Sequence, residues 1–202
     1  MTIERLGRQH VAAVAALHGA SLSGLLTQLG PAALRAYYVA CAESPLATAF
    51  VALDGNTVQG FVLGSTATSG LRRDVIRRNP VGVLAGIAAG VLRRPVVLRW
   101  LIRSARGPDS GFYDATAPEL IYLAVSPGQR GRGTGRLLVD AFADAMRAAG
   151  QTRFELSVDK SNREGAAFYE RLGFTRLGEY DEFGRRHIRY ASPVAPSQRA
   201  GQ

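Results

Sequence analysis

The sequence has very little of the residues on which disulfide and metal scaffolds depend. Cys41 is the only cysteine among 202 residues, so no intrachain disulfide can form and a secreted, disulfide-stabilised scaffold is excluded. The three histidines, His10, His18 and His187, are scattered along the chain. One cysteine and three separate histidines do not make a structural zinc site, so we expect no metal.

Long hydrophobic runs are also missing. The first nine residues lack the basic, then apolar, then small-residue order of a secretory signal. The longest nearly apolar run, residues 81–92, has 12 residues, whereas about 20 are needed to span a bilayer as a helix. We therefore expect a cytoplasmic protein.

Lysine is nearly absent, because Lys160 is the only one, yet the chain carries a formal net charge of +9. Arginine supplies almost all of this charge. A basic surface attracts nucleic acid, an anionic membrane face or a phosphate-rich cofactor. No nucleic-acid-binding module is visible, so nucleic acid is the least favoured of these partners.

The remaining sequence alternates between strand and helix patterns, and its 47% hydrophobic content fits one globular domain, predicted over residues 1–191 with a flexible tail at 192–202. The predicted strands are 2–6, 47–53, 57–64, 120–125, 153–158, 174–180 and 185–190. The predicted helices are 11–19, 31–42, 136–149 and 164–172, with a loop over 21–27. Asp54-Gly55-Asn56 is a strong hairpin signal between the second and third strands.

Residues 66–113 form an arginine-rich insert with nine arginines and two acids, Asp74 and Asp109. A structureless loop of that length is unusual, so we expect two or three helices, around 71–78, 80–93 and 95–106. One interpretation is an amphipathic element over 71–106 that touches an anionic membrane or a polyanionic acceptor. A second interpretation, which we favour, is that the helices pack on the domain with a solvated arginine face. The third is a lid that binds a phosphorylated acceptor.

A glycine-rich loop, residues 126–135, lies between the strand at 120–125 and the helix at 136–149. Glycines let successive backbone N–H groups converge, and the helix that follows adds its positive amino-terminal end, so the loop suits a diphosphate. It lacks the lysine of a P-loop. Gly131, Gly133 and Gly135 recur at every second residue, which does not match the dinucleotide-binding fingerprint.

These residues resemble a known signature in two parts. The first part is an apolar strand and Val125-x-Pro127, followed by Arg130-x-x-Gly133-x-Gly135. The second part is Asn162-x3-Ala166-x-Phe168-Tyr169-Glu170-x-Leu172-Gly173-Phe174. Together they resemble the acyl-CoA signature of the GNAT superfamily of N-acetyltransferases, firmly over residues 119–190 and in element order over 1–65.

The resemblance implies the GNAT fold, of the α/β (α+β) class. This is a mixed, mostly antiparallel sheet of about seven strands with helices on both faces, here with a helical insert between the third and fourth strands. It also implies an acetyl-CoA site without a metal, in which main-chain groups of the fourth strand pair with the pantetheine arm and the glycine-rich loop holds the pyrophosphate. The implied coenzyme-binding residues are Leu123, Ala124, Val125, Arg130, Gly131, Arg132, Gly133, Thr134, Gly135, Asn162, Ala166 and Tyr169.

For catalysis, the resemblance implies that the Tyr169 hydroxyl points at the thioester sulfur. A phenol, with a pKa of about 10, stays protonated at neutral pH and can donate to the leaving thiolate. Glu119, at the start of the fourth strand, is the first candidate for the base, since some family members place a catalytic glutamate there. Tyr122 and Asp114 are secondary candidates.

Four other residues are weighed and favoured as structural. His18 precedes a loop that would border the acceptor pocket, but a lone histidine on a helix is more often structural. Glu182 and His187 flank the last hairpin and are expected at the surface. Cys41 is expected to be inert packing on the second helix.

The predicted function is an N-acetyltransferase that moves acetyl from acetyl-CoA to a primary amine of a small metabolite or amino sugar, by direct attack in a ternary complex. A protein amino-terminal or lysine acceptor is the nearest alternative. Alternatives of another class are an acyl-CoA sensor without turnover and a membrane or nucleic-acid adaptor. The sequence leaves open the acceptor, the length of the acyl group and whether the chain forms a homodimer.

Overall fold

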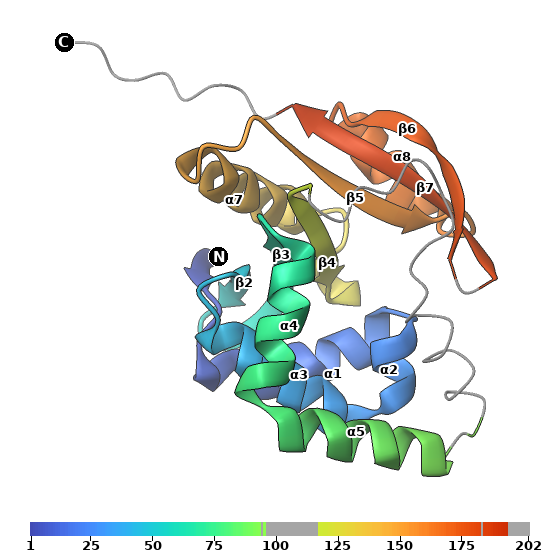
Figure 1. Ribbon diagram of the computed structural model, residues 1–202. Helices are drawn as coiled ribbons and strands as arrows, with labels where there is room; N and C mark the ends of the chain where they lie inside the picture. The colour runs from blue at the N-terminus through green and yellow to red at the C-terminus, as the bar shows by residue number, and fades with distance from the viewer. Residues whose placement is uncertain (94, 96–116, 183, 194–202) are drawn as a thin grey trace.

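A seven-stranded mixed sheet organises the computed structural model, which describes residues 1–93, 95, 117–182 and 184–193 (Figure 1). The strand order is β1-β2-β3-β4-β5-β7-β6, and every neighbouring pair is antiparallel except β4 and β5. This confirms the predicted GNAT sheet. The strands are β1 (Thr2–Arg5), β2 (Thr48–Asp54), β3 (Thr57–Ser65), β4 (Glu119–Val125), β5 (Arg153–Asp159), β6 (Thr175–Glu182) and β7 (Arg185–Pro193).

Helices cover both faces of the sheet, as predicted (Figure 1). The α-helices are α1 (Val11–Ser21), α2 (Leu25–Leu29), α3 (Pro31–Glu43), α4 (Thr68–Arg78), α5 (Pro80–Arg93), α7 (Thr134–Ala148) and α8 (Arg163–Arg171). One apolar cluster joins α1, α3 and α4 to the sheet through buried residues such as Val14, Tyr38 and Phe61. A second cluster joins α7 and α8 to the opposite face through residues such as Phe142 and Phe154.

The sheet is weakest where its two parallel strands meet. Only Glu119 with Glu155 and Leu120 with Leu156 pair between β4 and β5. The register between β3 and β4 also shifts next to this point, between Leu63 and Gly64. Beyond Leu120, β4 therefore has no paired residue in β5 along the described strands. Its main chain over 121–125 is open on that edge, as a coenzyme arm would require.

The insert begins with two of the predicted helices, α4 and α5, which are bent by 94° at their junction. In the described part of the chain no single helix is long and apolar enough to cross a bilayer, although α4 and α5 together would pass such a test of length and composition. The third predicted helix, 95–106, lies outside the described residues, as does most of the predicted tail.

Close packing of α5 on α3 and on the end of α2 depends on two glycines. A Cβ at Gly86 would lie 2.6 Å from the Cβ of Ala33, and one at Gly90 would lie 2.9 Å from the Cα of Leu29. Real Cβ atoms do not approach that closely, so glycine at these positions sets the distance between the helices. The inner face of α5 is therefore fixed against the domain.

The loop predicted over 21–27 was wrong in part, because α2 begins at Leu25. Leu26 packs against the main cluster and Leu29 is buried beside Ala33. The burial of these leucines holds the turn in a helical conformation. A helix of five residues is too short to show a 3.6-residue period in the sequence.

Candidate active site

The glycine-rich loop has the backbone that an anion site needs. Gly131 and Gly133 have φ values of 74° and 84°, in the left-handed region that favours glycine. The Leu137 N–H donates to the Gly133 carbonyl at 3.1 Å, which is the first bond of α7. The N–H groups of residues 134–136 therefore have no acceptor within the helix and carry its positive end. Nothing lies within 4 Å of a Cβ placed at Gly131 or Gly133, so the loop is open to a ligand.

The two parts of the sequence signature meet in space. A Cβ at Gly135 would lie 3.2 Å from the Phe168 ring, so the start of α7 packs closely on α8 at a position where glycine is required. At its other end the loop is fixed to β3, because the Ser126 hydroxyl donates to the Gln59 side chain at 2.7 Å and the Ser126 N–H donates to the Gln59 carbonyl at 2.8 Å. The predicted coenzyme residues of both parts thus lie around one junction.

Asn162 has a structural role in addition to any contact with a ligand. It is the N-cap of α8, and its Oδ1 accepts from the Gly165 N–H at 2.9 Å. The side-chain amide group remains available to donate. Ala166, one turn later, is half-buried against the apolar cluster under α7 and α8. Both residues lie on the helix that carries Tyr169.

Tyr169 is 7% exposed and is held by aromatic neighbours. Its ring centroid lies 5.0 Å from that of Phe168 and 5.3 Å from that of Phe174, both in edge-on arrangements. Burial raises the pKa of the Tyr169 hydroxyl well above its usual value. The hydroxyl is therefore protonated throughout the physiological range, as a proton donor must be.

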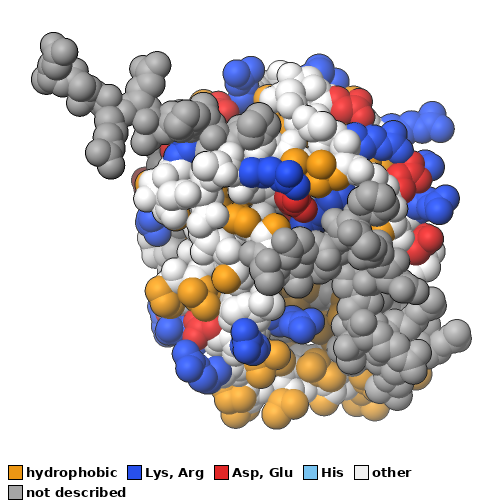
Figure 2. Space-filling model, turned by 45° about the horizontal axis from the view of Figure 1, so that its top comes forward, with side chains coloured by type: hydrophobic (Ala, Val, Ile, Leu, Met, Phe, Trp, Pro, Cys, Tyr) orange, Lys and Arg blue, Asp and Glu red, His pale blue; other side chains and the backbone are white. Residues whose placement is uncertain are grey.

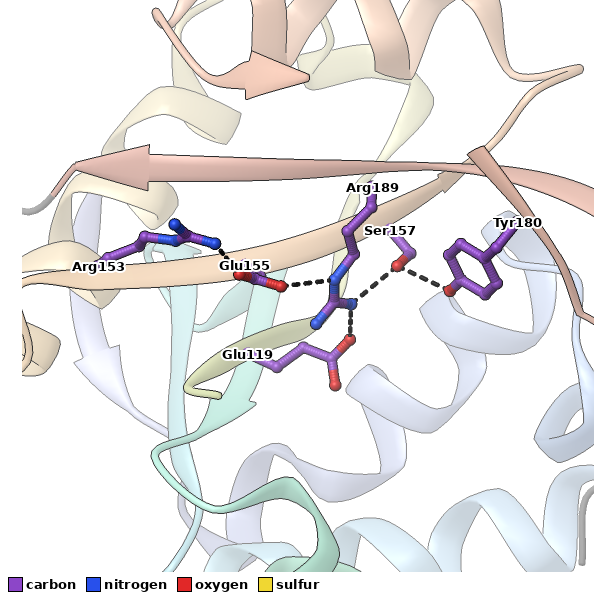
Figure 3. A network of polar contacts seen from close by, with 6 residues as sticks. All are labelled: Glu119, Arg153, Glu155, Ser157, Tyr180 and Arg189. Carbon is purple, nitrogen blue, oxygen red and sulfur yellow. Dashed lines mark hydrogen bonds and ion pairs between the residues drawn. The ribbon is translucent and has the colours of Figure 1, made fainter. Parts of the chain in front are cut away.

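Glu119 lies in a buried network at the point where the sheet divides (Figure 3). The guanidinium of Arg189, which has no exposed surface, bonds the carboxylates of Glu119 and Glu155, the latter at 3.0 Å. Arg189 also donates to the Ser157 hydroxyl at 2.8 Å, and the Tyr180 hydroxyl donates to Ser157 at 2.8 Å. Arg189 of β7 thus bridges two carboxylates that face one another across the β4–β5 pair, and Arg153 supplies a second positive charge to Glu155.

Sequence reasoning missed Arg189 and Glu155. The pair Glu119 and Arg189 is separated by 70 residues, and no local spacing connects them. A buried guanidinium between two carboxylates is costly to break, because removing either partner leaves an uncompensated charge. The network holds the mouth of the site, and it binds the carboxylate that the sequence suggested as the base.

Glu182, the last residue of β6, is a further carboxylate near this network. It is half-buried rather than at the surface, and among the described residues it makes no ion pair. Burial raises the pKa of Glu182, and the charge of Glu119 raises it further, while His187 and Arg189 act in the opposite direction. His187 is also half-buried, and its ring stacks on Tyr180 at 5.6 Å.

The hairpin that carries Glu182 reaches the helical half of the molecule. Arg185, at the start of β7, donates to the Ser23 hydroxyl at 2.9 Å, which joins the β6–β7 turn to the segment between α1 and α2. Tyr122 of β4 lies between these parts: its ring is 4.7 Å from His18 on α1, and the charge of Glu182 contributes to raising the pKa of its hydroxyl. The hairpin, β4 and α1 thus bring phenol and carboxylate groups close enough to interact electrostatically.

His18 is a structural residue, as the sequence favoured. It is 1% exposed, its Nδ1 lies 2.7 Å from the Tyr38 hydroxyl, and its ring stacks on Phe61. Burial lowers the pKa of His18 to about 4, so the imidazole is neutral at physiological pH. Cys41 lies on the same face of the core, 2% exposed, and burial raises the pKa of its thiol to about 12. Asp114 lies outside the described residues.

Two curated proteins are similar to parts of this chain. The mycothiol acetyltransferase of Beutenbergia cavernae is 42% identical over 71 residues, which are 35% of this chain and 24% of that protein. The phosphinothricin N-acetyltransferase of Streptomyces coelicolor is 35% identical over 78 residues, which are 39% of this chain and 44% of that protein. The matches thus span less than half the length of either relative.

Solved structures agree in fold over the whole chain. The ribosomal-protein-S18-alanine N-acetyltransferase of Escherichia coli has a TM-score of 0.59 at 14% identity, covering 100% of this chain and 98% of that one. The family model described as "Acetyltransferase (GNAT) family" matches residues 17–174, which include the glycine-rich loop, α7 and α8. The chain therefore belongs to the GNAT family of acetyltransferases.

Proposed function

We propose that this enzyme transfers an acetyl group from acetyl-CoA to a primary amine of a small metabolite or amino sugar, by direct attack in a ternary complex. The observation that carries the proposal is the junction of the open β4 edge, the glycine loop and the buried Tyr169. The two curated relatives are named for small-molecule acceptors, which supports the choice of acceptor class.

The family uses acetyl-CoA, and the described residues fit it. The main chain of Leu123, Ala124 and Val125 pairs with β3 but not with β5, and on that open side it would bond the pantetheine amides. The N–H groups of Arg130, Gly131, Arg132, Gly133, Thr134 and Gly135 would hold the pyrophosphate, with Asn162 and Ala166 beside them. The bound thioester supplies the acetyl group and a thiolate leaving group.

Tyr169 acts as the acid in the proposed reaction. The amine nitrogen attacks the thioester carbonyl carbon, the carbon–sulfur bond breaks and the Tyr169 hydroxyl donates a proton to the departing sulfur. Its raised pKa keeps that proton available at every pH at which the enzyme works. A protonated amine has no free lone pair and cannot attack. The mechanism therefore also needs a base that accepts the proton of the incoming ammonium group.

Two carboxylates compete for the role of base. Glu119 was the first candidate from the sequence, but its carboxylate is bonded to Arg189. Glu182 has no ion pair among the described residues, and burial raises its pKa, which favours it as a proton acceptor. We therefore assign the base to Glu182 and a positioning role to Glu119, through Arg189.

Thiol release from acetyl-CoA with a panel of amines tests the assignment of the acid. Tyr169→Phe should lower kcat by about 100-fold or more, because general acid catalysis of this kind contributes that much, with little change in coenzyme affinity. Unchanged turnover would remove Tyr169 from the mechanism. A panel of amino sugars, small amines and short peptides separates the acceptor classes, and peptide acetylation alone would favour the protein-acceptor alternative.

The pH dependence of kcat/KM tests the base. A carboxylate with a raised pKa loses its basic form as pH falls through that pKa, so the acidic limb should lie above the ordinary value of about 4.3. Glu182→Gln should abolish this limb and lower the plateau, with an unchanged melting temperature. Glu119→Gln should lower the melting temperature and keep the limb. If the limb disappears in Glu119→Gln instead, Glu119 is the base.

A further inference from the structure

Helix α5 is apolar on every side. Its inner face packs on Ala33 of α3 through Gly86 and on Leu29, the last residue of α2, through Gly90. Its outer face carries Val81, Leu84 and Leu92, which are 77%, 66% and 86% exposed. The alanines at 85 and 88 lie exposed on the same side, so the outer stripe holds no polar side chain over three turns. A helix that is hydrophobic all round is normally buried. The outer face of α5 is therefore a surface that needs a partner.

The charge around this stripe is of one sign. Arg72, Arg73 and Arg77 are exposed on α4, and Arg93 is exposed at the end of α5. Within residues 68–93 the only acid is Asp74, which is buried and accepts bonds from Ser44 at 2.6 Å and from Arg78 at 2.6 Å. Figure 2 shows hydrophobic side chains gathered along the lower edge of this face, with basic side chains above them.

We infer that α4 and α5 form a peripheral membrane-binding surface that seats this enzyme on an anionic lipid layer. Leucine and valine side chains of α5 enter the boundary between headgroups and acyl chains, while the arginines contact lipid phosphates. Asp74 fixes α4 to Ser44 and also accepts from Arg77 and Arg78, whereas Arg72 and Arg73 are exposed and make no ion pair among the described residues. The inference does not depend on the proposed acceptor or on the assignment of the base.

Two other partners fit this surface less well. A second copy of the chain, packed through the same face, would bring two basic surfaces together without an acid to pair them. Nucleic acid would use the arginines, but it offers no apolar environment for exposed leucines. An anionic bilayer complements both the charge and the apolar stripe.

Vesicle co-sedimentation tests the inference. Vesicles of phosphatidylcholine with about one third phosphatidylglycerol should bind the full chain at low salt, and vesicles of phosphatidylcholine alone should bind it far less. Leu84→Gln with Leu92→Gln should weaken binding more than about tenfold, because two leucines lose an apolar environment. Arg72→Gln with Arg73→Gln should weaken it about tenfold, and added salt should remove most of that difference.

Matched variants on the opposite part of the molecule serve as controls. Leu137→Gln, an exposed leucine of α7, and Arg171→Gln with Arg176→Gln, which remove the same charge, should bind vesicles as the unaltered chain does. Melting temperature and coenzyme affinity should be unchanged in every variant, which separates loss of binding from misfolding.

Three kinds of outcome would overturn the inference. One is the absence of binding to the anionic vesicles at low salt, or binding that Leu84→Gln with Leu92→Gln does not weaken. Another is a concentration-dependent dimer in sedimentation velocity that the same double variant dissociates, which would assign the stripe to a second copy of the chain. Binding of short duplex DNA, lost with the arginines and not with the leucines, would assign the face to nucleic acid.

Discussion

The glycine loop at 130–135 and helix α5 are built from similar residues and do opposite things. Both combine regularly spaced glycines with arginine. In the loop, Gly131 and Gly133 have left-handed φ values and open space where a side chain would be. In α5, Gly86 and Gly90 are helical, and the space beside them is filled by Ala33 of α3 and by Leu29 at the end of α2. Glycine at every second residue opens the backbone to a ligand, whereas glycine at every fourth residue closes one helix onto another.

The largest effect is expected where a side chain is added between α5 and the helix it packs on. Gly86→Val would place atoms against the Cβ and Cα of Ala33, and backbone cannot move aside cheaply. We expect a loss of about 3 kcal/mol in the free energy of unfolding. Coenzyme affinity of the folded fraction should be unchanged. Denaturant unfolding and calorimetry with coenzyme A measure the two effects, and a stable Gly86→Val protein would contradict the packing of α5.

A substitution in the glycine-rich loop should affect coenzyme affinity more than stability. Gly133→Ala adds a methyl group that meets no protein atom but forces a left-handed φ, so the free energy of unfolding should fall by about 1–2 kcal/mol. The N–H groups that follow would lose their alignment, and the Kd for coenzyme A should rise about tenfold or more. Calorimetry checks the affinity. An unaltered Kd would argue that this loop does not hold the diphosphate.

A glycine in a turn outside the site provides a control for the effect of backbone strain. Gly55, between β2 and β3, also has a left-handed φ, 57°, and open space around it. Gly55→Ala should cost about 1 kcal/mol in the free energy of unfolding, for the same backbone reason as Gly133→Ala. Coenzyme affinity should not change, and a shift in Kd here would show that strain alone weakens binding.

The smallest effect is expected at Gly82, at the start of α5. A Cβ there would meet only the side chain of Asn79, whose Oδ1 accepts from the Gly82 N–H at 3.0 Å, so a small shift of that flexible side chain would be needed. Alanine is also the better helix former, so Gly82→Ala should change the free energy of unfolding by less than about 0.5 kcal/mol. Thermal unfolding of Gly82→Ala and Gly86→Val, measured together, would show whether the loss of stability comes from replacing a helix glycine or from the contact with the facing helix.

Much of the fold could be predicted because its signals are local. Gly131, Gly133 and the helix after them are consecutive in sequence, so their chemistry could be inferred before their position was known. Helices α4 and α5 followed from apolar residues and arginines at near-helical spacing. The outer stripe of α5 could not be found in this way, since a helix that is apolar on all sides does not show which side meets α3.

The candidate site was harder to predict where it depends on distant pairs. Glu119 was chosen for its place on a strand, but the structure binds it to Arg189, and no pattern in the sequence links the two. Glu182 was expected at the surface, yet the hairpin turns it towards the charges of Glu119 and Arg189. The roles of the residues implied by the family resemblance, Tyr169 among them, stay predictions until the variants are measured.

The burial of Cys41 has a practical consequence for those measurements. A thiol whose pKa is raised to about 12 holds almost no thiolate at neutral pH, and only the thiolate attacks a disulfide reagent. While the protein is folded, this thiol should therefore give no colour of its own in an assay for free coenzyme A. In the thiol-release assay, colour formed with an aromatic disulfide dye would then report free coenzyme A alone. Slow additional colour, equal to one equivalent of protein, would mark unfolding that exposes Cys41.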